Sequence, residues 1–120
     1  MSSGYYLNFI KLVLGTINKD PKQKSLTFFR ADNISLEIYC KILTNYYNGS
    51  PTFIEELAKG AQYGSRVTIK KKVNDAIAMN FLNSTQSKKD KRKIAIVPSN
   101  KMIKEFETHV QNLKDVLSKL

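Results

Sequence analysis

The sequence has few of the residues on which disulfide-stabilised proteins and many enzymes depend. It contains one cysteine and one histidine, so an intrachain disulfide is impossible and a reducing environment is expected. We expect Cys40 to be a buried, inert thiol on the apolar face of a helix. We expect His109 to have a structural or solvent-exposed role rather than a sensing one.

Recognisable catalytic patterns are missing as well. No metal-ligand spacing occurs, and no glycine-rich phosphate loop precedes a helix. The adjacent carboxylates Glu55 and Glu56 would point in different directions on a helix, so they do not form an acid–base pair. We therefore expect no enzymatic activity, no cofactor and no metal.

Long apolar runs are absent too. No stretch approaches the length needed to cross a bilayer, and the opening Met-Ser-Ser-Gly-Tyr-Tyr lacks the basic segment of a secretory signal. We expect a cytoplasmic protein without a membrane partner.

Acidic residues are scarce relative to basic ones. Twenty Lys and Arg stand against ten Asp and Glu, which gives a formal net charge of +10. Between Lys59 and Lys93, ten basic and two acidic residues give a local charge of +8. A localised basic surface is the electrostatic footprint of a protein that binds a phosphate backbone. At 120 residues, the chain is expected to form one domain, residues 1–120.

The segment from Ser65 to Ala76 reads as a helix that would lie in a nucleic-acid groove. Ser65 is a favourable N-cap residue. An apolar stripe follows at helical spacing, formed by Ile69, Val73, Ala76 and Ile77. At roughly 100° per residue, Lys71 points away from this stripe. The same outward side carries Val67, Thr68, Asn74 and Asp75, flanked by Lys70 and Lys72.

A helix-turn-helix and a basic hairpin are predicted around this segment. Thr52 and Glu55 have the spacing of a capping box at the start of a short helix, and Ala61–Gly64 supplies the turn. After the recognition helix, Met79–Ser84 and Arg92–Val97 are predicted to pair as strands. The hairpin forms a wing over residues 83–93.

Three further helices are predicted outside this core. Ser3–Asn18 and Asn100–Leu120 carry apolar residues at intervals of three and four, and we expect them to form a dimer interface. The alternative is a monomer whose two terminal helices fold onto one core. Ser35–Tyr47 is the third helix, with a buried face formed by Leu36, Tyr39, Cys40, Leu43, Tyr46 and Tyr47. In the connector before it, Leu26–Phe29 fits either a short strand or a tucked loop.

The order of these parts resembles the MarR-type winged-helix transcriptional regulators. The resemblance runs from Ser35 to Phe106 and is carried by Thr-Phe-Ile-Glu-Glu-Leu-Ala-Lys from Thr52, the helix from Ser65, and Asp-Lys-Arg-Lys from Asp90. It implies a homodimer that is held by N- and C-terminal helices and binds pseudo-palindromic duplex DNA. By position, Ser65, Thr68, Lys70 and Lys71 would contact DNA in the major groove, and Arg92 would enter the minor groove. The chain departs from the family in having one C-terminal helix where most members have two.

The predicted fold is therefore mainly α with a small β-hairpin wing (α+β), a winged helix-turn-helix with dimerisation helices at residues 1–18 and 99–120 and a DNA-binding core at 35–98. We expect a transcriptional regulator, nucleoid-associated, that binds double-stranded DNA as a homodimer; an effector is unknown. The expected DNA contacts are Ser65, Arg66, Val67, Thr68, Lys70, Lys71, Lys72, Asn74, Lys88, Lys89, Lys91, Arg92 and Lys93. The expected dimer contacts are Tyr6, Ile10, Val13, Ile17, Ile103, Phe106, Val110, Leu113, Leu117 and Leu120. Two alternatives are a sequence-indifferent architectural DNA-binding protein and a winged helix that binds an acidic protein partner.

Overall fold

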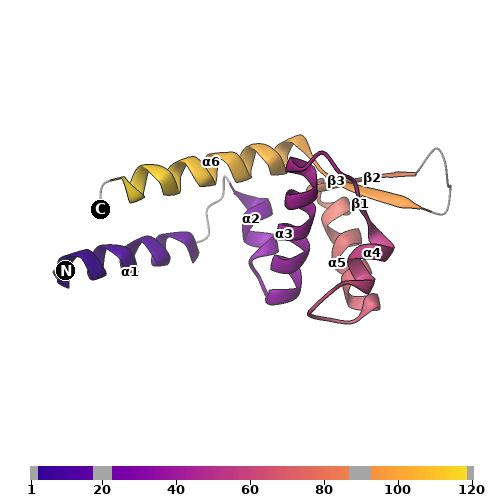
Figure 1. The fold of residues 1–120 in the computed structure, drawn as a ribbon, viewed down its shortest axis with the longest axis horizontal. Helices are drawn as coiled ribbons and strands as arrows, with labels where there is room; N and C mark the ends of the chain where they lie inside the picture. The colour runs from indigo at the N-terminus through magenta and orange to yellow at the C-terminus, as the bar shows by residue number, and fades with distance from the viewer. Residues whose placement is uncertain (1–2, 18–22, 87–92, 119–120) are drawn as a thin grey trace.

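A computed structural model describes residues 3–17, 23–86 and 93–118, and it shows a helical protein with one small sheet (Figure 1). In chain order the elements are α1 (Ser3–Ile17), α2 (Lys24–Phe29), α3 (Asn33–Tyr47), β1 (Thr52–Phe53), α4 (Ile54–Lys59), α5 (Arg66–Ala78), β2 (Leu82–Gln86), β3 (Ile94–Pro98) and α6 (Asn100–Leu117). The predicted fold class, mainly helical with a winged helix-turn-helix, is confirmed.

The sheet has the strand order β1-β3-β2, with both neighbouring pairs antiparallel. The predicted hairpin is present as β2 and β3, in which Leu82 lies opposite Pro98 and Gln86 opposite Ile94. The third strand, β1, was not predicted. Its Thr52 lies opposite Ile96 of β3, so the expected capping box at Thr52 is wrong. Pairing with the sheet places Thr52 in extended backbone, and α4 begins two residues later without a side-chain cap.

One apolar core joins the helices to the sheet. Its buried side chains come from α2, α3, α4, α5, the hairpin and the start of α6, and they include Phe29, Ile38, Ile42, Leu57, Ile69, Val73, Phe81, Leu82, Ile96 and Met102. The elements from α2 to the start of α6 thus share one core, because each short helix can bury its stripe only against the others.

The structure corrects two predictions in the first half of the core. The segment Leu26–Phe29 is part of helix α2, neither a strand nor a loop. In α3 the buried face is centred on Ile38, Tyr39, Ile42 and Leu43, whereas Leu36, Cys40, Tyr46 and Tyr47 are exposed. Apolar residues occur on more than one side of α3, so the spacing pattern did not identify the packed side.

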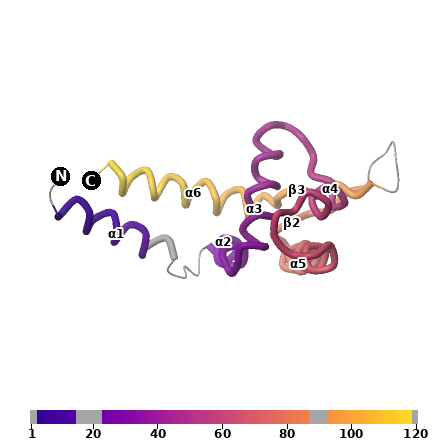
Figure 2. Tube along the Cα trace, turned by 60° about the horizontal axis from the view of Figure 1, so that its bottom comes forward, coloured from indigo at the N-terminus to yellow at the C-terminus, as the bar shows by residue number. Residues whose placement is uncertain are grey.

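The two terminal helices extend away from the core. Figures 1 and 2 show α1 and α6 side by side at the end opposite the hairpin, with both chain termini at that end. The molecule is accordingly elongated, with extents of 57 × 27 × 25 Å and a radius of gyration of 16.5 Å, against about 14 Å for a compact domain of this length. None of the described helices is both long enough and apolar enough to cross a membrane.

Candidate nucleic-acid interface

The recognition helix predicted at residues 65–80 is α5, Arg66–Ala78. Ser65 is its N-cap, with extended backbone, and its Oγ accepts a hydrogen bond from the Thr68 N–H at 3.2 Å. Ile69, Val73 and Ala76 are fully buried. Asn80 takes the left-handed conformation that ends the helix, with φ of 63°. The cap and the apolar stripe therefore agree with the prediction.

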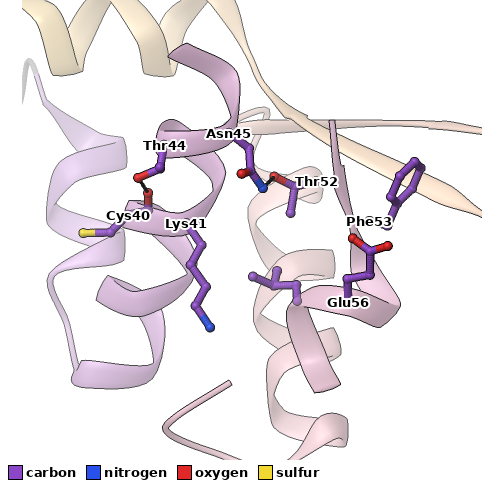
Figure 3. Close-up of a pocket in the computed structure, with 8 residues that line it drawn as sticks. Cys40, Lys41, Thr44, Asn45, Thr52, Phe53 and Glu56 are labelled. Carbon is purple, nitrogen blue, oxygen red and sulfur yellow. Dashed lines mark hydrogen bonds between the residues drawn. The ribbon is translucent and has the colours of Figure 1, made fainter. Parts of the chain in front are cut away.

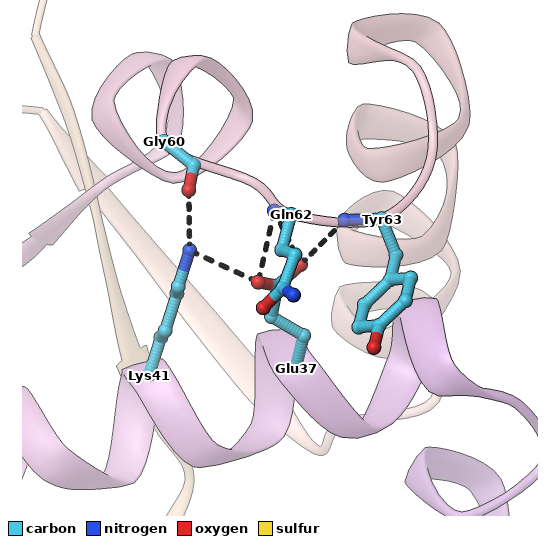
Figure 4. Close-up of polar contacts among 5 residues, drawn as sticks. All are labelled: Glu37, Lys41, Gly60, Gln62 and Tyr63. Atoms are coloured by element: carbon cyan, nitrogen blue, oxygen red, sulfur yellow. Dashed lines mark hydrogen bonds and ion pairs between the residues drawn. The ribbon is translucent and has the colours of Figure 1, made fainter.

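The turn between α4 and α5 is held by α3, which the sequence did not indicate. Glu37 accepts backbone hydrogen bonds from Gln62 at 2.9 Å and from Tyr63 at 3.1 Å (Figure 4). Lys41, one turn along α3, donates to the Gly60 carbonyl at 2.8 Å. Partial burial opposes ionisation of Glu37, but these N–H donors and Lys41 leave its pKa lowered. The partners are 25 and 26 residues apart in sequence, so no local pattern identifies them.

The side of α5 away from the core is open to solvent. Val67 is 78% exposed, and the Lys71 side chain is 75% exposed. Asn74 is also exposed, while Thr68 is half-buried, with its hydroxyl 3.0 Å from that of Ser65. One cation, one amide and one methyl surface are thus presented on a helix whose opposite side is fixed in the core.

Each cation on α5 forms an ion pair within the protein. The pairs are Arg66 with Glu55, Lys70 Nζ with Glu55 Oε1 at 2.6 Å, Lys71 Nζ with Asp75 Oδ2 at 3.2 Å, and Lys72 Nζ with Asp32 Oδ2 at 2.9 Å. The spacing of four residues along the helix favours the Lys71–Asp75 pair. The pairs with Glu55 and Asp32 join α5 to other elements, so no local spacing indicates them.

The ion pairs lower the pKa of two of these carboxyl groups, those of Asp32 and Glu55. The ammonium of Lys72, with a further hydrogen bond from the Ser35 N–H, lowers the pKa of Asp32 to about 2. The hydrogen bond from Lys70 and the charge of Arg66 lower the pKa of Glu55. Both groups are therefore ionised at neutral pH, and they offset part of the positive charge of α5.

The wing is described only at its base. Lys93 is exposed, and its Nζ lies 5.2 Å from the centre of the Phe53 ring of β1, close enough for a cation–π contact. The other predicted wing contacts, Lys88, Lys89, Lys91 and Arg92, lie outside the described residues. The strands that lead to them project from the core beside α4 and α5 (Figure 1).

At the other end of the molecule, most of the predicted dimer contacts are exposed. Tyr6, Ile10 and Val13 of α1 and Val110 and Leu117 of α6 are exposed large apolar residues. Ile103 and Leu113 are half-buried. Phe106 is half-buried against the chain's own α3, with ring centres 6.0 Å from those of Tyr39 and Tyr47. Leu120 and the side chain of Ile17 lie outside the part of the chain that the structure describes.

A separate concave site lies between α3 and the segment formed by β1 and α4. A cavity of about 370 Å³ is lined by Cys40, Lys41, Thr44 and Asn45 of α3 and by Thr52, Phe53, Glu56 and Leu57 (Figure 3). Asn45 Nδ2 donates to Thr52 Oγ1 at 2.8 Å across it. Cys40 is exposed here rather than buried as predicted, but partial burial still raises the pKa of its thiol. In the described residues, no three His, Cys, Asp or Glu side chains gather as metal ligands would.

Comparison with known proteins identifies the fold. No family model matches the chain, and no curated protein sequence matches it. Among solved structures, YusO from Bacillus subtilis matches with a TM-score of 0.57 and 14% identity, over 99% of this chain and 83% of that one. The transcriptional regulator Tm0710 from Thermotoga maritima matches with a TM-score of 0.60 and 17% identity, over 98% and 78% of the two chains. A point mutant of MepR from S. aureus matches with 0.60 and 14%, over 100% and 85%. The fold is that of MarR-type winged-helix proteins, as the resemblance implied.

Proposed function

We propose that this protein is a MarR-type transcriptional regulator that binds double-stranded DNA as a homodimer. The observation that carries the proposal is the two-sided character of α5. Its Ile69 and Val73 side is fully buried, while Val67 and Lys71 are largely exposed on a winged-helix fold shared with a transcriptional regulator. An α-helix fits the major groove of B-DNA, where each base pair presents a distinct pattern of donors and acceptors.

The side chains divide by the part of DNA they would contact. Arg66, Lys70, Lys72 and the wing residues would pair with phosphates, which supplies affinity without sequence information. Lys71 and Thr68 would reach base edges, and Val67 would touch a thymine methyl group. Arg92 of the wing would suit a narrow, electronegative minor groove.

Exposed apolar side chains support the proposed homodimer. Tyr6, Leu7, Ile10 and Leu14 of α1 are each more than half exposed in the single chain, and apolar patches of this kind mark association surfaces. A two-fold dimer through α1 and α6 would set two copies of α5 roughly 34 Å apart, one turn of duplex.

The test is a mobility-shift titration of the protein against the DNA upstream of its own gene, with random duplex as competitor. A regulator is expected to bind the upstream DNA at least a thousandfold more tightly. Equal binding to both would indicate an architectural protein, and the absence of salt-dependent duplex binding would contradict the proposal.

The variant Lys71→Ala tests the predicted base contact. We expect it to weaken binding to the upstream site by about 1–3 kcal/mol, and binding to random duplex by less. Lys104→Ala on α6 removes the same charge from a residue that is not among the proposed DNA contacts, and it is the matched control. Equal losses on both DNAs would show that Lys71 contacts only phosphates.

A further inference from the structure

Two cations of the recognition helix converge on one carboxylate of the preceding helix. Arg66 and Lys70 lie one turn apart on α5 and therefore on the same side of it. Glu55, in the first turn of α4, receives Arg66 at Oε2 and Lys70 at Oε1. Two positive charges thus share one negative charge, which leaves this site with a net charge of +1.

This arrangement has the chemistry of a phosphate site with an internal anion in place. Guanidinium and ammonium groups bind carboxylates and phosphates through the same charge-assisted hydrogen bonds. The Arg66 side chain is 65% exposed and that of Glu55 is 50% exposed, so an external anion can approach and the carboxylate has room to rotate away.

We propose that Arg66 and Lys70 form a clamp for one DNA backbone phosphate, and that Glu55 occupies this clamp in the free protein. Duplex binding then exchanges the carboxylate for a phosphate. The inference rests on the proposed function, because it assigns the role of one phosphate contact within the proposed DNA interface.

The other two carboxylates beside α5 differ from Glu55 in ways that make exchange less favourable. Asp75 is on α5 itself and holds Lys71 alone. Asp32 holds Lys72 through Oδ2, while its Oδ1 accepts the Ser35 N–H at 2.7 Å as the N-cap of α3. Capping fixes the position of Asp32 and ties it to the stability of α3. Glu55 has no such second bond among the described residues, and it alone engages two cations.

The exchange predicts a specific effect on salt dependence. Each phosphate neutralised by a protein cation releases condensed counterions, so affinity falls with salt in proportion to the number of such contacts. When a cation must first leave an internal carboxylate, the freed carboxylate attracts a cation from solution and the net release is smaller. Removing the charge of Glu55 should therefore both tighten binding and steepen the salt dependence.

The experiment compares Glu55→Gln with Glu56→Gln in titrations of a random duplex at several salt concentrations. Glu56 is the neighbouring carboxylate in the same first turn of α4; it is exposed and forms no ion pair with any described residue. Both variants change the net charge by the same amount, so they differ only in whether Arg66 and Lys70 lose their carboxylate partner. We expect Glu55→Gln to tighten binding about three- to tenfold and to increase the salt slope by about one, and Glu56→Gln to change affinity about twofold or less.

A double-mutant cycle adds a readout that altered stability would not produce. Arg66→Ala should weaken duplex binding more in the Glu55→Gln background than in the wild type, because wild-type Arg66 must first give up its ion pair with Glu55 before it can bind a phosphate. Thermal unfolding of each variant checks that the fold is retained.

The possible results separate the two proposals. Equal shifts for the two glutamate variants, or a cycle without coupling, would overturn the clamp while leaving DNA binding intact. No salt-dependent duplex binding by any of the proteins would overturn the proposed function and the clamp with it.

Discussion

The turn before α5 contains Gly64, and the free-energy cost of replacing this glycine can be divided into a backbone part and a steric part. Gly64 has a φ of +77°, and a Cβ built there would lie 3.0, 3.1 and 3.2 Å from the Cδ1, Cγ1 and Cγ2 atoms of Ile34. Gly49, after α3, has nearly the same φ, +74°, but a Cβ there would meet nothing within 4 Å. The two glycines therefore share the backbone cost of an alanine and differ in the steric cost.

The backbone cost comes first. A left-handed conformation costs a residue with a Cβ about 1–2 kcal/mol, and we expect Gly49→Ala to destabilise the protein by roughly that amount. At Gly64 the Ile34 side chain must also move. Because all three of its outer carbons are crowded, no single rotation relieves every contact, and overpacking adds about 1–3 kcal/mol. The expected total for Gly64→Ala is about 2–5 kcal/mol.

Urea unfolding of the two variants measures this difference. Ile34→Ala removes the three crowded carbons, so Gly64→Ala in that background should cost only what Gly49→Ala costs in the wild type. Of the two glycine variants, only Gly64→Ala should weaken duplex binding, since only the turn at Gly64 determines where α5 lies. The reasoning would be refuted if both glycine variants were equally stable, or if the extra cost persisted after Ile34→Ala.

Three other outcomes are expected. Ile10→Glu should convert the proposed dimer to a monomer in analytical ultracentrifugation, whereas Lys11→Glu on the same helix should not; a monomeric wild type would contradict this. Glu105→Ala should lower the free energy of unfolding by about 2–4 kcal/mol. The reason is that the buried carboxylate accepts hydrogen bonds from the N–H of Ser25 at 2.9 Å and from the Ser25 hydroxyl at 2.7 Å. Glu105→Gln, which keeps an acceptor, should cost less. The pKa of Asp32 is lowered to about 2 in the folded protein, so its contribution to stability is present above pH 4 and is lost between about pH 4 and 2. Asp32→Asn, which keeps a good N-cap, should show a shallower loss of stability in acid, and identical acid profiles would contradict the assigned pairing.

The features of α5 were predictable because they are encoded over short distances. Its cap, its apolar stripe and the exposure of Lys71 follow from the types of residue within one or two helical turns. The left-handed Asn80 is likewise a local feature. A helix with a strong cap and a single stripe leaves few alternatives, so tertiary contacts had little to change.

The misjudged features depended on partners elsewhere in the chain. Thr52 and Glu55 have the spacing of a capping box, yet Thr52 pairs with Ile96 of β3 and Glu55 binds Arg66. The local signal was real, but closing a three-stranded sheet outweighed it. The four residues Leu26–Phe29 are too few to display a helical period, and α2, to which they belong, is stabilised by packing against α3.

Backbone hydrogen bonds link the end of α5 directly to the start of α6. The N–H of Phe81 donates to the carbonyl of Ala76 at the end of α5, and the carbonyl of Phe81 accepts the N–H of Ser99, both at 2.9 Å. Ser99 then caps α6, and the Phe81 and Met102 side chains beside it are fully buried. One residue therefore bonds to the end of α5 and to the start of α6. If α1 and α6 form the proposed dimer, this joint determines the separation of the two copies of α5, while the exposed residues further along α6 determine only how strongly the copies associate. Replacing the buried Phe81 ring would disturb the packing around this joint and so change the preferred half-site spacing, whereas substitutions near Leu117 would change the dimer affinity without changing that spacing.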